Sequence, residues 1–163
     1  MSEWRNRIVG EGEEQPDQLL ANPFNWRIHP LAQQRALDGI LQEVGWVQRV
    51  IVNRRTQHVV DGHARIALAI SRGEKSIPVI YVDISEQEEL LVLAALDPIA
   101  ALAATDQAKL DEILRDVSTD NEGLSELLAE LSKAQSFQPA PEDEQPHQTA
   151  KAKTVCPACG HEF

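Results

Sequence analysis

The sequence predicts an α/β fold in which helices pack on a small mixed sheet and the C-terminal half is helical. Short runs of β-branched and apolar residues at 50–52, 58–60 and 77–82 are typical of strands. Apolar residues at helical spacing precede and separate these runs, and after residue 85 every periodic segment has helical spacing. At 163 residues, the chain is long enough for one such domain with appendages.

The N-terminal residues show no apolar period, so we expect residues 1–16 to form a polar, Glu-rich arm. The folded domain and its helical extension are then predicted over residues 17–133. The stretch NPFNWRIHP, residues 22–30, has prolines near both ends, and proline restricts the preceding backbone to extended or turn geometry. We therefore expect an ordered loop with aromatic anchors, neither strand nor helix.

One helix is expected between this loop and the first strand. Pro30 suits its first turn and Gly45 suits its end. Its apolar face repeats at i, i+3, i+4 and i+7 and consists of Leu37, Ile40, Leu41 and Val44. The polar turn 53–57 then joins strands 50–52 and 58–60 into a hairpin.

A second helix is expected from about Gly62 to Ser71, where small and apolar residues alternate at helical spacing. The third strand, 77–82, contains Pro78. Because proline cannot donate a ladder hydrogen bond, Pro78 predicts an edge or end position for it.

The helical half begins with a capping box, in which Ser85 stands three residues before Glu88. The helix that follows is expected to run to about Leu96. Asp97 would then cap or turn the chain before Pro98, although a carboxylate at this position is also a candidate metal contact.

Two further helices are expected at 106–117 and 121–133, each with leucines on one face. Both are predominantly acidic, so they are unsuited to reading DNA through a helix-turn-helix. Residues 134–153 contain prolines, acids and Gln without an apolar period, which predicts a flexible linker. Residues 154–163 are expected to form a separate small element.

The net charge of −11 disfavours bulk attraction to nucleic acid, but the charge is unevenly distributed. Residues 22–82 hold eight Lys or Arg against four acids, whereas residues 83–163 hold five against seventeen. The basic segment is either an ordinary solvated surface or a site for phosphates and DNA. The longest apolar run, 90–104, is broken by an Asp-Pro pair and is too short to span a bilayer. We expect a cytoplasmic protein without membrane contact.

The stretch VVDGHARIALAI, residues 59–70, changes from a strand to a helix at an Asp-Gly pair. The first turn of a helix leaves backbone N–H groups without partners and carries partial positive charge. Gly62 would let a phosphate approach the backbone, Arg65 can donate to its oxygens, and His63 can donate or transfer a proton. The same pattern also occurs where a chain merely turns a corner.

Together with NPFNWRIHP and GWVQRVIVN, this stretch resembles the nuclease-like N-terminal domain of the ParB/sulfiredoxin superfamily, of the type found in phages and mobile elements. The resemblance covers about residues 17–118 and implies a nucleotide pocket that takes CTP or ATP with Mg²⁺. The residues that it assigns to nucleotide binding are Asn25, Arg27, His29, Gln48, Gly62, His63 and Arg65. His63 and Asp97 are the candidates for a catalytic role.

Several positions depart from the patterns of this superfamily. Sulfiredoxins need a catalytic cysteine where this chain has His63, so reduction of a sulfinic acid is not expected. Partition-type proteins carry two adjacent arginines where this chain has Ala64 and Arg65, and a Glu-Asn pair where it has Leu96 and Asp97. We therefore expect a phosphate site that binds better than it catalyses, and whether the chain is an enzyme stays open.

The two cysteines occur in CPACGHEF, which is similar to a zinc knuckle. Cys156 and Cys159 can clamp a tetrahedral Zn²⁺, and His161 is a third candidate ligand. A fourth ligand would come from His147 or from a second chain sharing the metal. Free thiols or a redox pair are the alternatives.

Three functions remain in competition. The first, which the sequence favours, is a nucleotide-binding module acting in DNA transactions of a phage, plasmid or mobile element. The second is a metal-dependent nuclease or nucleotide hydrolase. The third is an interaction adaptor with a degenerate fold, in which helices 106–133 form a homodimer and the cysteine element docks a partner.

Overall fold

The computed structural model describes the backbone of residues 3–136 and the side chains of residues 3–133. A four-stranded sheet has the order β1-β4-β2-β3; β4 is antiparallel to β1 and parallel to β2, and β2 is antiparallel to β3. The strands are β1 (Ile8–Glu14), β2 (Val50–Asn53), β3 (Val59–Asp61) and β4 (Ile77–Val82). The predicted α/β fold with a small mixed sheet is confirmed.

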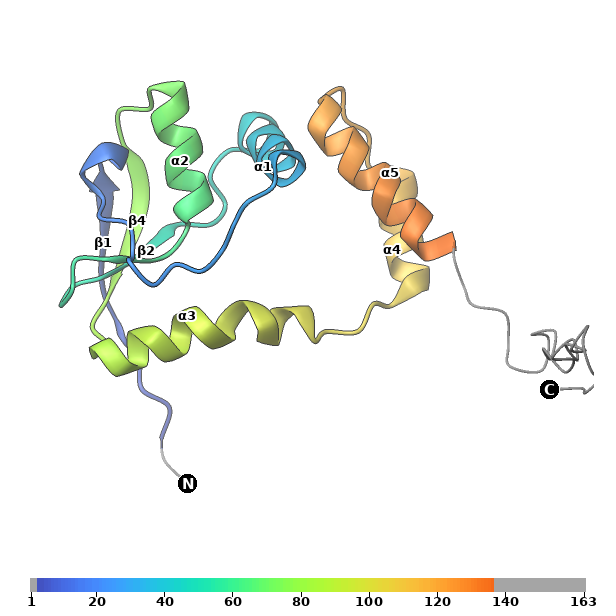
Figure 1. Cartoon of the computed structure of the whole chain (residues 1–163). Helices are drawn as coiled ribbons and strands as arrows, with labels where there is room; N and C mark the ends of the chain where they lie inside the picture. The colour runs from blue at the N-terminus through green and yellow to red at the C-terminus, as the bar shows by residue number, and fades with distance from the viewer. Residues whose placement is uncertain (1–2, 137–163) are drawn as a thin grey trace, which may run out of the picture.

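The helices follow the predicted order, and a single 3₁₀ turn, η1 (Pro16–Gln18), precedes them. They are α1 (Leu31–Glu43), α2 (His63–Arg72), α3 (Glu86–Ala101), α4 (Gln107–Asp116) and α5 (Glu122–Ser136). In Figure 1, α2 and α1 lie beside the strands, α3 runs beneath them, and α5 lies next to α1. Within the described residues, no helix is long and apolar enough to cross a membrane.

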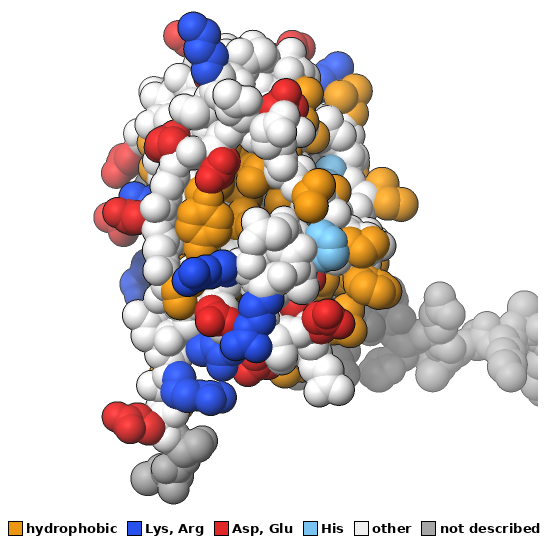
Figure 2. Space-filling model, turned by 90° about the vertical axis from the view of Figure 1, so that its left-hand side faces the viewer, with side chains coloured by type: hydrophobic (Ala, Val, Ile, Leu, Met, Phe, Trp, Pro, Cys, Tyr) orange, Lys and Arg blue, Asp and Glu red, His pale blue; other side chains and the backbone are white. Residues whose placement is uncertain are grey.

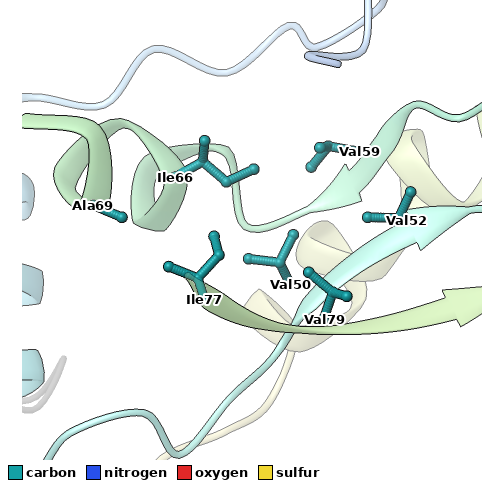
Figure 3. Close-up of a cluster of buried hydrophobic side chains, with 7 residues drawn as sticks. All are labelled: Val50, Val52, Val59, Ile66, Ala69, Ile77 and Val79. Atoms are coloured by element: carbon teal, nitrogen blue, oxygen red, sulfur yellow. The ribbon is translucent and has the colours of Figure 1, made fainter. Parts of the chain in front are cut away.

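The core lies between α2 and the sheet. Ile66 and Ala69 on one face of α2 meet the valines and isoleucine of the strands (Figure 3). The buried cluster comprises Val50, Val52, Val59, Ile66, Ala69, Ile77 and Val79. Because full burial of one such aliphatic side chain contributes about 1.5–3 kcal/mol, this cluster fixes where α2 begins and how it is oriented.

The prediction of an irregular arm over residues 1–16 is wrong for its second half, because Ile8–Glu14 forms strand β1 along the edge of the sheet. Backbone pairing with β4 makes this strand, and no apolar period marks it. The Tyr81 ring of β4 lies across this strand, 3.8 Å from a Cβ placed on Gly10 and 3.6 Å from one placed on Gly12, which are ordinary contact distances.

Two expectations based on proline also need correction. The strand that contains Pro78 is internal, between β1 and β2, so the edge alternative is wrong; the end alternative fits, because Pro78 is the second residue of β4 and the pairing with β2 begins at Val79. The helix expected to end near Leu96 continues through Pro98 to Ala101. Pro98 removes one backbone hydrogen bond, but the alanines after it favour helix strongly enough for the helix to continue. Asp97 therefore lies inside a helix rather than at its cap.

The α4–α5 extension returns to the domain through a close crossing of α5 over α1. A Cβ placed on Gly39 of α1 would lie 2.8 Å from Leu124 Cγ, and one placed on Gly123 of α5 would lie 2.7 Å from the Arg35 carbonyl carbon. Both helices need glycine here because any side chain would push them apart. α5 therefore packs on a helix of its own chain.

Candidate functional site

A cleft of about 370 Å³ opens between the loop 22–30, α1, the start of α2 and α3. Strand residues Ile51 and Val60 line its wall. All the residues that the resemblance assigned to nucleotide binding or catalysis line it: Asn25, Arg27, His29, Gln48, Gly62, His63, Arg65 and Asp97. The structure thus brings together residues from four separate segments of the chain. Their roles in binding remain predictions.

The start of α2 requires a glycine. Gly62 has φ 104° and ψ 14°, a left-handed conformation that residues with a side chain rarely adopt. A Cβ there would lie 2.9 Å from Val50 Cγ2 and 3.2 Å from Arg65 Nη2. No side chain caps this end of the helix, so its first N–H groups face the cleft region without a side-chain acceptor.

Arg65 is almost entirely buried, at 8% exposure, although it carries a full charge. Its Nη2 donates to Asp61 Oδ2 at 2.5 Å, one helical turn earlier. Its Nε is buried and has no hydrogen-bond partner. A buried N–H without an acceptor is costly, so Arg65 is held at the cleft with one donor unsatisfied.

Arg27 repeats this arrangement on the opposite wall. Its guanidinium forms an ion pair with Asp97 and lies 5.3 Å from the centre of the Trp26 ring, a cation–π distance. Its Nε is likewise buried without a partner. In the part of the chain whose side chains are described, the Nε atoms of Arg27 and Arg65 are the only buried side-chain nitrogens or oxygens in this state. Both belong to the same cleft.

His63 is held by a backbone donor. Its Nε2 accepts a hydrogen bond from the Asn22 N–H at 3.2 Å. Burial lowers the pKa of His63, the Asp61 carboxylate opposes this, and the nearby His29 lowers the pKa further. The ring is therefore neutral near pH 7. A general base acting through Nε2 would first have to break the bond to Asn22.

The loop 22–30 is fastened along one face of α3. The three contacts are Asn22 Nδ2 to Glu89 Oε1 at 2.7 Å, Trp26 Nε1 to the Leu93 carbonyl oxygen at 3.1 Å, and the Arg27–Asp97 ion pair. On α3 these positions are four residues apart, so they share one face of the helix. Asp97 lies inside α3 rather than at a turn, and it pairs with the arginine of this wall; its contact with a metal stays a prediction.

Sequence reasoning missed the buried group that anchors this loop. Glu89 is only 4% exposed, and three side-chain donors converge on its carboxylate. They are Asn22 Nδ2 at 2.7 Å, Asn53 Nδ2 at 2.5 Å and Thr56 Oγ1 at 2.6 Å. Burial raises the pKa of Glu89, but these hydrogen bonds outweigh it and leave the pKa below the ordinary value. Nothing in the local pattern of α3 distinguishes Glu89 from the solvated acids beside it.

The remaining site predictions have different outcomes. Asn25 Oδ1 accepts from the Arg27 N–H at 3.3 Å and shapes the loop. The cysteine element, Cys156, Cys159 and His161, lies outside the described residues, so the zinc prediction is untested. Among residues 3–133, no group of three His, Cys, Asp or Glu side chains could hold a metal ion.

Comparison with known proteins adds to this geometry. No protein family model and no curated protein matches the sequence. The structure is similar to that of the C-terminally truncated chromosome-partitioning protein ParB from Caulobacter crescentus complexed with CTP-gamma-S. The TM-score is 0.52 at 20% sequence identity, with 66% of this chain and 61% of that chain covered. The fold is ParB-like.

This chain spans less than two thirds of the Caulobacter ParB chain, with 61% of that chain covered. Two structures of a pNOB8-like ParB N-domain are more distant. They have TM-scores of 0.47 and identities of 14% and 12%, and cover 81% and 83% of this chain and 51% and 50% of theirs. At 20% identity, the likeness to the Caulobacter ParB establishes the ParB-like fold and leaves the ligand to be argued from the cleft.

Proposed function

We propose that the protein is a ParB-like nucleotide-binding module, which takes CTP or ATP with Mg²⁺ in the cleft at the start of α2. One observation carries the proposal: Arg27 and Arg65 line the same cleft, and each has a buried Nε without a hydrogen-bond partner. The ParB of similar fold was solved with a CTP analogue, which supports this choice of ligand class.

Phosphate oxygens suit this cleft chemically. An oxyanion in the cleft would supply acceptors for the guanidinium N–H groups of Arg27 and Arg65 and for the backbone N–H groups at the start of α2, which no side chain caps. Asp61 and Asp97 already neutralise the two guanidiniums, so the cleft cannot offset the charge of a triphosphate by itself. Mg²⁺ would neutralise part of this charge, since it binds through phosphate oxygens with few protein ligands.

A thermal-shift screen of CTP, ATP, GTP and UTP, with and without Mg²⁺, tests the proposal. A ligand at 100 times its Kd stabilises the folded chain by about 2.7 kcal/mol, which corresponds to a shift of several degrees. Arg65→Ala is expected to abolish the shift, measured against that variant's own melting temperature.

The matched control is Arg72→Ala, because Arg72 is also on α2 and also pairs with an aspartate, Asp38, but lies outside the cleft. It should retain the full nucleotide shift. A flat response of the unmodified chain to every nucleotide would refute the proposal.

We propose further that the module acts in DNA transactions of a phage, plasmid or mobile element. The supporting feature is the basic segment 22–82, although ion pairs already involve five of its eight basic side chains. Figure 2 shows basic side chains interspersed with acidic ones on one face. We therefore expect weak, salt-sensitive DNA binding. Electrophoretic mobility shifts at two salt concentrations, with and without nucleotide, measure it.

Binding rather than turnover is proposed because the candidate base, His63, already accepts a hydrogen bond at Nε2 and Asp97 is paired with Arg27.

The zinc site at Cys156, Cys159 and His161 is a separate proposal. Elemental analysis for zinc before and after chelation tests it, and light scattering of the same samples tests whether a homodimer depends on the metal.

A further inference from the structure

Asn22 begins the loop that walls the cleft, and every polar group that it carries is engaged. It is 4% exposed. Its side chain donates to Glu89 and accepts from the Phe24 N–H at 3.0 Å, and its carbonyl accepts from the Asn25 N–H at 3.0 Å. Its own N–H donates to His63. Asn22 does not line the cleft, so these groups serve the structure of the loop.

Glu89 holds Asn22 in this position. The Glu89 carboxylate also accepts from Asn53 and Thr56 on the β2–β3 hairpin, so it joins α3, the hairpin and the loop. Asn53 is fully buried and donates as well to the Ile84 carbonyl at 3.0 Å. Because all these partners are buried or partly buried, Asn22 has little freedom to move.

The contact with His63 determines which ring nitrogen carries the proton. A backbone N–H can only donate, so His63 Nε2 must be the unprotonated nitrogen. In the neutral ring the proton is then on Nδ1. His63 is the first residue of α2 and lines the cleft beside Gly62, where a phosphate group would lie.

We propose that Asn22, held by Glu89, is a positioning residue that fixes His63 as the Nδ1–H tautomer, so that this N–H donates to a phosphate oxygen. The donor role rests on the proposed nucleotide function, whereas the choice of tautomer does not. Neither Asn22 nor Glu89 touches the ligand. Their effect reaches the site only through the orientation and protonation of one imidazole.

The tautomer is measured without ligand, by ¹⁵N-resolved NMR of the imidazole rings in the full chain at pH 7.5, with His63→Gln to assign the signals. The unmodified chain should show an unprotonated Nε2 and a protonated Nδ1 at His63. Asn22→Ala keeps the backbone N–H but removes the side-chain bond to Glu89 that holds it in place, so it should shift the ring toward the Nε2–H tautomer or a mixture. Glu89→Gln should do the same, and it serves as the second variant if Asn22→Ala does not fold.

Two controls match these changes. Asn6 also accepts, through its side chain, the N–H two residues later, but it is exposed and does not line the cleft. Glu86 is an exposed acid in the first turn of α3. Asn6→Ala and Glu86→Gln should leave the His63 signals unchanged. An Nε2–H tautomer in the unmodified chain, or unchanged signals in both test variants, would overturn the assignment.

Nucleotide affinity then tests the donor role separately. Asn22→Ala should weaken nucleotide binding about tenfold, the loss expected from one misdirected hydrogen bond to a charged group. A changed tautomer with unchanged affinity would overturn the donor role. If the unmodified chain binds no nucleotide, the proposed function fails, but the ligand-free spectra still decide which tautomer Asn22 imposes.

Discussion

Replacing Gly62 by alanine should destabilise the protein much more than the same change at the other end of the helix. Gly62 and Gly73 flank α2, and both have left-handed backbones, with φ of 104° and 72°. A Cβ on Gly62 would meet Val50 Cγ2 at 2.9 Å, whereas a Cβ on Gly73 would meet no atom within 4 Å. The pair therefore separates backbone strain from steric overlap.

The two contributions differ in size. A left-handed backbone costs a residue with a side chain about 1–2 kcal/mol, and both variants carry this cost. Forcing an extra methyl group against the fully buried Val50 adds about 1–3 kcal/mol in Gly62→Ala alone. For a domain of this size the additional destabilisation corresponds to a melting temperature about 4–12 °C lower than that of Gly73→Ala.

Circular dichroism at a helix-sensitive wavelength, followed during heating, measures both variants and the unmodified chain. Chemical denaturation at 25 °C checks that the ranking does not depend on temperature. Equal melting temperatures for Gly62→Ala and Gly73→Ala would refute the close approach of Gly62 to Val50 of β2. In that case the start of α2 would have room for a side chain.

Three further predictions concern pH and packing. Burial lowers the folded-state pKa of His63 below 6.5, which Asp61 opposes and His29 assists. The stability of the fold should therefore decrease as pH drops from above 6.5 through the lowered pKa. The melting temperature of His63→Gln should lack this part of the pH dependence. Tyr81 is the only tyrosine, and burial together with the Glu14 carboxylate raises its pKa to about 12. Its ultraviolet titration should therefore have a midpoint near 12, and this midpoint should decrease in Glu14→Gln. The stability of the fold should correspondingly fall as pH rises above 10. Gly123→Ala places a Cβ 2.7 Å from the Arg35 carbonyl carbon, so amides of α4 and α5 should exchange faster with deuterium while those of α2 remain protected.

The sequence predicted the fold where apolar periodicity or turn chemistry decides it. The valine runs, the capping box at Ser85 and the Asp-Gly corner all have local causes, and the corresponding strands, helix start and turn are present. Strand β1 was missed because its glycines and glutamates carry no apolar alternation, and only its neighbour β4 makes it a strand. Pro78 was correctly limited to an edge or an end position, but local sequence does not encode which of the two applies, because that depends on the neighbouring strands.

The residues of the cleft were likewise predictable only where short local stretches identify them. Its lining residues could be gathered from a resemblance because they occur in short, recognisable stretches. The partners that hold them could not. Glu89 has the same surroundings in sequence as solvated acids. Asn22 is distinguished by contacts with His63 and Glu89, which lie 41 and 67 positions later. Buried polar partners across such separations emerge only once the fold brings the segments together.

The four-residue spacing of Glu89, Leu93 and Asp97 on α3 sets where the loop 22–30 is attached along the cleft. Each of these positions serves a successive part of the loop, from Asn22 to Arg27. One residue inserted between Glu89 and Leu93 would rotate the later positions by about 100° around the helix axis. The loop would then lose two of its three attachments together, although no side chain of the cleft had changed. Here the length of a helical segment is as much a part of the site as the residues that line it.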